Sequence, residues 1–145
     1  MIGYSILDGS TLSFLTNGPF KTGNEPSAIV IDPRGKFLYL SNELDNTVGA
    51  YSIDLPTGTP TTTVNVTGSP LDSTDTQPVA IVVDPALGRF VYTVNHLGNS
   101  VSGFVLDPTS GALKATQASP YPITGTMPTA IVAIPHGNHA IQAVD

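Results

Sequence analysis

One segment occurs three times along the 145-residue chain, and this repetition constrains the fold more than any other feature of the sequence. Residues 26–33 and 78–85 share the pattern Pro-x-Ala-Ile-Val-x-Asp-Pro, and residues 128–135 repeat it with Ile134 in place of the Asp. The three copies begin about fifty residues apart. Repeats of this length are typical of architectures in which each repeat is one supersecondary unit packed against its neighbours.

Each repeat contains short apolar runs separated by turn sequences. Residues 28–31 and 37–40 are β-branched or aromatic runs, and Asp32 and Pro33 begin the turn between them. We find no stretch of about ten residues that has a helical period and lacks both Gly and Pro. Strands of this length and spacing predict an all-β fold.

The repeats predict four strands each, here called A to D. Residues 36–42 match residues 89–95 over strand B, and residues 46–54 match residues 99–107 over strand C. A turn with a glycine and a further strand follow in both repeats. Four antiparallel strands in about fifty residues form one blade of a β-propeller, and this is the architecture that we predict.

The alignment predicts three blades' worth of strands, with one blade divided between the two ends of the chain. Residues 1–25 align with strands C and D, residues 26–77 and 78–127 with whole blades, and residues 128–145 with strands A and B. Lone strand pairs would leave apolar edges unpaired. We therefore expect strands A and B of one copy to pair with strands C and D of another.

This pairing predicts a homodimer that closes as a six-bladed propeller. Two copies are favoured over three, because nine blades exceed the usual range of about four to eight and closed dimers are the commonest oligomers. The alternative that the alignment leaves open is a piece cut from a longer propeller.

Charge and composition exclude several classes of partner. Eleven acidic and five basic residues give a net charge of −6, which disfavours nucleic acids and anionic membranes. No apolar run is long enough to span a bilayer. The sequence has no Cys, so disulfides and thiolate chemistry are excluded. Low charge and abundant Thr and Ser are typical of extracytoplasmic proteins, although the first residues do not resemble a signal peptide.

The repeats resemble those of lactonase-like, or YVTN-type, propellers, the group that contains bacterial phosphogluconolactonase and the cyclising muconate lactonizing enzyme. Residues 39–42 and 92–95 lie where that family has its Tyr-Val-Thr-Asn motif. Asp107 and Pro108, followed by Gly111 and Leu113, are also similar to the family consensus. The resemblance implies a propeller with its site on the face formed by the B–C and D–A loops. It implies the fold more than an activity, because catalytic and scaffolding proteins share the repeat.

These loops supply the candidate site residues. His96, Glu43 and Asp75 are candidate catalytic residues, since a histidine titrates near neutrality and can activate water against a lactone ring. The candidate ligand-binding residues are Asn42, Asn95, Asp45 and Glu25. Asn42 and Asn95 also fit a structural role, in which their amides hold the turn through local hydrogen bonds.

The composition of this face favours binding over catalysis. The two arginines fall in A–B turns at the opposite end, whereas a phosphorylated or dicarboxylate lactone calls for an arginine fork. We therefore predict a non-catalytic module that assembles into a ring and binds a small molecule or a protein at its acidic face and axial channel. The alternative is a lactone hydrolase that uses His96 and a nearby carboxylate.

No cofactor or metal site is predicted from the motifs. Ca²⁺ held by acidic loops is an alternative, for which Asp72 and Asp75 have the nearest suitable spacing. His136 and His139 are expected to be surface residues of an A–B turn, and Asp145 to end the last strand B.

Overall fold

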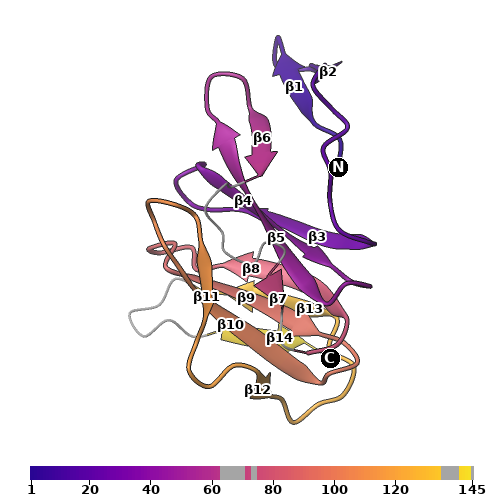
Figure 1. The fold of residues 1–145 in the computed structure, drawn as a ribbon, viewed down its shortest axis with the longest axis vertical. Helices are drawn as coiled ribbons and strands as arrows, with labels where there is room; N and C mark the ends of the chain where they lie inside the picture. The colour runs from indigo at the N-terminus through magenta and orange to yellow at the C-terminus, as the bar shows by residue number, and fades with distance from the viewer. Residues whose placement is uncertain (63–70, 73–74, 135–140, 145) are drawn as a thin grey trace.

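The computed structural model describes residues 1–62, 71–72, 75–134 and 141–144, which form antiparallel strands joined by turns (Figure 1). The described residues include no helix that is long and apolar enough to cross a membrane. The strands in chain order are β1 (Tyr4–Leu7), β2 (Thr11–Phe14), β3 (Pro26–Ile31), β4 (Phe37–Asn42), β5 (Thr47–Asp54), β6 (Thr59–Thr62), β7 (Leu71–Asp72), β8 (Pro78–Val83), β9 (Phe90–Asn95), β10 (Ser100–Leu106), β11 (Leu113–Ala115), β12 (Tyr121–Pro122), β13 (Ala130–Ala133) and β14 (Ile141–Val144).

Two larger sheets have the same strand order because they arise from the same sequence repeat. The first complete sheet runs β3-β4-β5-β6, and β7 also pairs with β5. The second complete sheet runs β8-β9-β10-β11, and β12 also pairs with β10. The remaining strands form two hairpins, β1-β2 and β13-β14. The prediction of an all-β, propeller-like fold of antiparallel sheets is confirmed.

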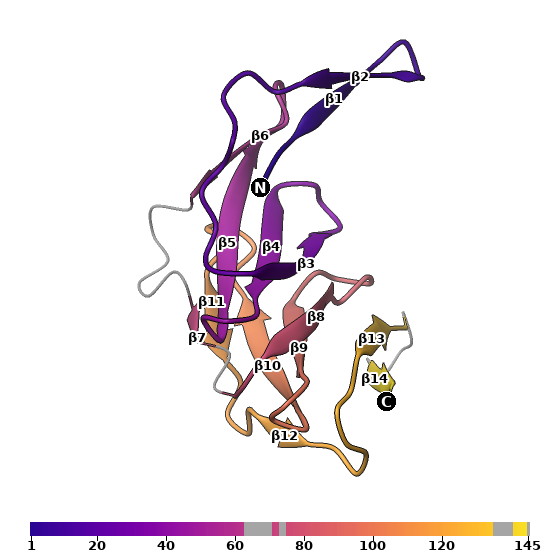
Figure 2. The same cartoon turned by 90° about the vertical axis from the view of Figure 1, so that its right-hand side faces the viewer.

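The two hairpins lie at opposite ends of the molecule. Figure 2 shows β1 and β2 beyond the first complete sheet, whereas β13 and β14 lie beside the second. The two complete sheets occupy the middle and face each other.

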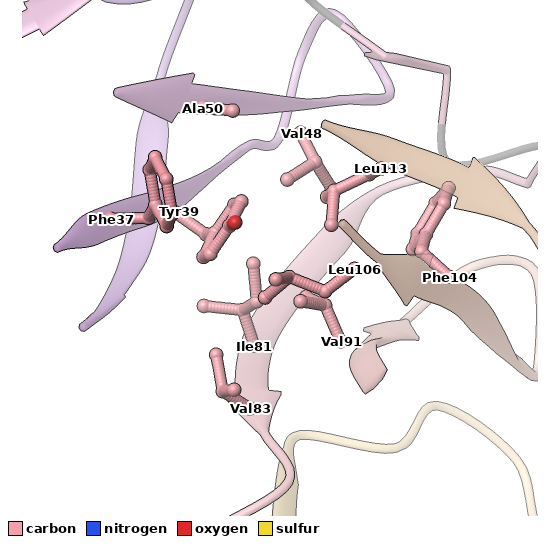
Figure 3. Packing of buried hydrophobic residues seen from close by; sticks show 10 residues of the cluster. All are labelled: Phe37, Tyr39, Val48, Ala50, Ile81, Val83, Val91, Phe104, Leu106 and Leu113. Atoms are coloured by element: carbon pink, nitrogen blue, oxygen red, sulfur yellow. The ribbon is translucent and has the colours of Figure 1, made fainter. Parts of the chain in front are cut away.

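The main apolar core lies between the two complete sheets (Figure 3). Alternation along β4 directs Phe37 and Tyr39 toward the second sheet, while Leu38 and Leu40 belong to a smaller cluster on the other face. The buried residues of the main core are Phe37, Tyr39, Val48, Ala50, Ile81, Val83, Val91, Phe104, Leu106 and Leu113. Burial of each large side chain contributes about 1.5–3 kcal/mol, so this interface is the main stabilising contact of the fold.

Buried carboxylates hold the turns between strands A and B. In the first sheet, Asp32 accepts hydrogen bonds from the backbone N–H groups of Lys36 and Phe37, at 2.7 and 2.8 Å, and from Nε of Arg34 at 2.7 Å. Burial alone would raise the pKa of Asp32, but these hydrogen bonds and the Arg34 charge lower it. The turn therefore holds its aspartate in the charged form.

Candidate functional site

The B–C turns and the D–A connections meet at one end of the sheets. The B–C turns are residues 43–46 and 96–99, and each bonds to the connection that precedes its own sheet. The N–H of Glu43 donates to the carbonyl of Glu25, and the N–H of His96 donates to that of Gln77, both at 2.8 Å. The repeat thus places Glu43 and His96 at equivalent positions of neighbouring sheets.

Glu43 is held by the connection that enters the second sheet. The side-chain Nε2 of Gln77 donates to Oε1 of Glu43 at 2.6 Å. Glu43 is only partly buried, so its carboxylate lies at the surface of this end. One carboxylate oxygen is fixed by this bond, and the group has a defined orientation.

His96 contacts the connection that leads into β13. Its Nδ1 lies 3.1 Å from the carbonyl oxygen of Pro128. A carbonyl oxygen only accepts, so Nδ1 carries the proton of this hydrogen bond. In the neutral ring, Nε2 then has the free lone pair and can act as a proton acceptor.

Gln77 bonds to both of these candidates and was not among the site residues predicted from the sequence. Its side chain binds Glu43 and its backbone carbonyl binds His96, and the structure describes no direct hydrogen bond between Glu43 and His96. Its Oε1 is buried, and no described group donates to it. The sequence signal that could have identified Gln77 is its position, because it directly precedes the proline that begins the repeat, as Glu25 and Met127 do. All three residues have a positive φ, between 47° and 65°.

Asparagines in the B–C turns fix the backbone of these connections. Oδ1 of Asn46 accepts the N–H of Gln77, and Oδ1 of Asn99 accepts the N–H of Met127, both at 2.7 Å. Each asparagine reaches from one repeat to the connection that enters the next. These two bonds hold Gln77 and Met127 in the left-handed backbone conformation, which costs free energy in a non-glycine residue.

Asp75 lies against the same turn as His96. Its Oδ2 accepts the hydroxyl of Ser100 at 2.7 Å, and its Oδ1 accepts the N–H of Thr76 at 2.8 Å. Burial would raise the pKa of Asp75, but the bonds from Ser100 and Thr76 lower it. The carboxylate is therefore a stable anion that supports the turn.

Asn42 and Asn95 are buried at the ends of their B strands. Oδ1 of Asn42 accepts the N–H of Gly23 at 3.1 Å, and its Nδ2 donates to the Thr47 hydroxyl at 3.1 Å. Nδ2 of Asn95 donates to the hydroxyls of Ser100 and Ser102, both at 2.9 Å. Asn42 thus bonds to the connection before its own sheet and to β5, and Asn95 bonds to side chains of β10.

The other candidates lie at the edge of this end. The carboxylate of Asp45 accepts two bonds of 2.7 Å from Asn24, one from the backbone and one from the side chain. Glu25 is exposed. His136, His139, Asp145 and the side chain of Asp72 lie outside the part of the chain that the structure describes. Within that part, no three His, Asp or Glu side chains gather into a metal-binding group.

Comparison with known proteins places this arrangement in a family. The family model described as lactonase, 7-bladed beta-propeller, matches residues 2–143. No curated protein matches the sequence.

Solved structures show the same fold at low sequence identity. A candidate 6-phosphogluconolactonase from Bacteroides uniformis is 23% identical, with a TM-score of 0.74 over 98% of this chain and 40% of its own. Another from Bacteroides fragilis is 22% identical, with a TM-score of 0.71 over 99% and 35%. The periplasmic gluconolactonase of Pseudomonas aeruginosa is 19% identical, with a TM-score of 0.71 over 99% and 36%.

The chain spans between 35% and 40% of the length of these three proteins. At such identities the structures show a shared fold alone, whereas the family match extends over nearly the whole chain. The resemblance expected from the tyrosine and asparagine motifs is confirmed. The chain belongs to the lactonase family, whose members are described as seven-bladed β-propellers.

Proposed function

We propose that the end of the sheets bearing Glu43, Gln77 and His96 hydrolyses a lactone. Family membership and the gluconolactonase neighbours favour this alternative over the non-catalytic module that the composition led us to predict. The observation that carries the proposal is the bond from His96 to the Pro128 carbonyl, because it leaves Nε2 as the proton acceptor.

The chemistry assigned to His96 is general-base catalysis. A water molecule attacks the carbonyl carbon of the lactone while Nε2 of His96 takes its proton. The ring C–O bond then breaks, and the proton passes from the imidazolium to the departing alkoxide oxygen. The products are a hydroxy acid and the neutral histidine, so the step needs no further reactant.

Glu43 is assigned to substrate orientation. Gln77 fixes one of its carboxylate oxygens, and the other can accept a hydrogen bond from a substrate hydroxyl. Glu25 and Asp45 lie on the same connections and turns, so the local charge is negative. A negative surface disfavours anionic substrates, and we therefore assign an uncharged, hydroxylated lactone as the substrate class.

Hydrolysis of glucono-δ-lactone, followed by acid release at constant pH, tests the proposal. His96→Gln should lower kcat/KM by about a hundredfold or more, since it removes the base and keeps a polar side chain. Leu97→Ala, at an exposed neighbour in the same turn, is the matched control and should leave kcat/KM unchanged. Equal rates for wild type and His96→Gln, or no rate above spontaneous hydrolysis, would overturn the proposal and return the chain to a binding role.

A further inference from the structure

One aspartate joins each B–C turn to the connection before its own sheet, and the two repeats supply this aspartate from opposite sides. In the first repeat it is Asp45, the third residue of the B–C turn. In the second repeat it is Asp75, which belongs to the connection. The alignment of the repeats pairs Asp45 with Gly98. It also pairs Asp75 with Gly23, so each aspartate has a glycine as its counterpart in the other repeat.

The two carboxylates bind to equivalent donors. Asp45 accepts the backbone N–H and the side-chain Nδ2 of Asn24, both at 2.7 Å. Asp75 accepts the backbone N–H of Thr76 at 2.8 Å and the Thr76 hydroxyl at 3.2 Å. Asn24 and Thr76 are equivalent residues of the two connections. We call the backbone N–H and the side-chain donor of this residue the carboxylate niche. Hydrogen bonds to an ionised acceptor are stronger than those to a neutral one.

Each carboxylate niche has room for one aspartate. A Cβ at Gly98 would collide with the carboxylate of Asp75, to which its three nearest atoms all belong. A Cβ at Gly23 would lie 2.6 Å from an oxygen of Asp45 and equally close to the amide of Asn42. Neither glycine has a positive φ, so the backbone itself would accept a side chain at both positions. The aspartate on the other side of the niche therefore excludes a second one.

In the second repeat, the niche fixes the turn that carries His96. The N–H of His96 donates to the carbonyl of Gln77 at 2.8 Å. Just beyond the turn, the hydroxyl of Ser100 donates to the carboxylate of Asp75 at 2.7 Å. The connection thus holds residues 96–99 at both ends, and the carboxylate supplies one of the two attachments.

We propose that Asp75 is the positioning residue for His96 and that Asp45 is the positioning residue for Glu43. Each carboxylate acts through the turn that it holds and does not touch the substrate. Because the niche accepts a carboxylate from either side, an aspartate at position 98 should replace Asp75. The consequence for catalysis rests on the proposed function, whereas the positioning of the two turns does not.

Amide hydrogen exchange in the whole chain tests the positioning without a substrate. Asp75→Gly should speed exchange at the N–H of His96 by about tenfold or more, because the turn then opens locally. Exchange at the N–H of Glu43 should stay within about twofold of the wild type. Asp45→Gly is the matched control and should do the reverse. An equal increase at both N–H groups in either variant would mean a general loss of stability and would overturn the proposal.

Exchanging the two residues of the second niche is the sharper test. Gly98→Asp alone should lower the urea midpoint, because two carboxylates then collide and repel each other in one niche. Asp75→Gly alone should also lower it. The double variant Asp75→Gly/Gly98→Asp reproduces the arrangement of the first repeat, and it should regain both the midpoint and the slow exchange at His96. A double variant no better than the single ones would overturn the proposal.

Kinetics on glucono-δ-lactone measure the consequence for catalysis. Asp75→Gly should lower kcat by about tenfold or more at unchanged KM, since a displaced base is lost in the transition state. Asp45→Gly should instead raise KM at unchanged kcat, because Glu43 orients the substrate. The same pattern in both variants would overturn the assigned roles. A wild type without activity would overturn the proposed function, and the exchange rates would then decide the positioning by themselves.

Discussion

The hydroxyl of Tyr39 donates a hydrogen bond to the backbone carbonyl of Gly111, 2.9 Å away and 72 residues further along the chain. Tyr39 is completely buried, and burial raises the pKa of its hydroxyl well above the ordinary value, so the group stays protonated. This bond ties strand B of the first complete sheet to the C–D turn of the second. It adds a directional contact beside the apolar core that lies between the two sheets.

Replacing Tyr39 by phenylalanine should destabilise the fold by about 1–3 kcal/mol, because the Gly111 carbonyl loses its donor in a buried site. The measurement is the free energy of unfolding in urea. Tyr4→Phe, at an exposed tyrosine, is the control and should change that free energy by less than about 0.5 kcal/mol. Equal stability of Tyr39→Phe and the wild type would show that the bond contributes nothing net.

Gly111→Ala should be more destabilising than Gly35→Ala. Both glycines have a positive φ, of 75° and 69°, so each alanine incurs a backbone cost of about 1 kcal/mol. The Cβ at position 111 would also collide with the ring of Phe37, whereas at position 35 it meets nothing within 4 Å. We expect a difference of about 1–3 kcal/mol in unfolding free energy. Equal losses would mean that the ring moves aside without cost.

Asp32→Asn should weaken the fold and change its response to acid. Because hydrogen bonds lower the folded-state pKa of Asp32 below its ordinary 3.8, its contribution is complete above that value and is lost as the pH falls through the lower folded value. Between about pH 5 and about pH 2, the free energy of unfolding in urea should fall more for the wild type than for Asp32→Asn. At the higher pH the variant should be less stable by about 1–3 kcal/mol.

The control for this experiment is Asp8→Asn, at an exposed aspartate of the first hairpin. It should follow the wild type at both pH values to within about 0.5 kcal/mol. An identical acid response of Asp32→Asn and the wild type would contradict the role given to the buried carboxylate.

Asn46→Ala should lower activity as well as stability. It removes the acceptor for the backbone N–H of Gln77, the residue whose side-chain Nε2 donates to Glu43. We expect the free energy of unfolding to fall by about 1 kcal/mol, and KM for the lactone to rise with little change in kcat. Asn46→Asp keeps the accepting oxygen and should restore both. Failure of this rescue would show that the amide acts through a different contact.

The repeat made most of the fold predictable. Local patterns such as the runs at residues 37–40 and 90–94 carry their own strand preference, and they form β4 and β9. Strand D differs from the prediction of one continuous strand, since β11 and β12 are separate segments beside β10. The reason is a local turn, in which the N–H of Ser119 bonds back to the carbonyl of Thr116 at 3.1 Å.

The candidate site was less predictable, because its contacts join different repeats. His96 and Glu43 were recognisable as reactive side chains, but their partners Pro128 and Gln77 are 32 and 34 residues away in the sequence. A residue such as Gln77 has no reactive type of its own. Its contacts with Glu43 and His96 form only in the folded protein, where the connection packs against the two turns.

The bonds from Asn46 to Gln77 and from Asn99 to Met127 run in one direction along the chain, from an earlier repeat to a later one. During synthesis, the two connections that carry Gln77 and Met127 therefore emerge after their acceptors have already been made. The fold can assemble sheet by sheet from the N-terminus, with every finished sheet serving as the template for the next.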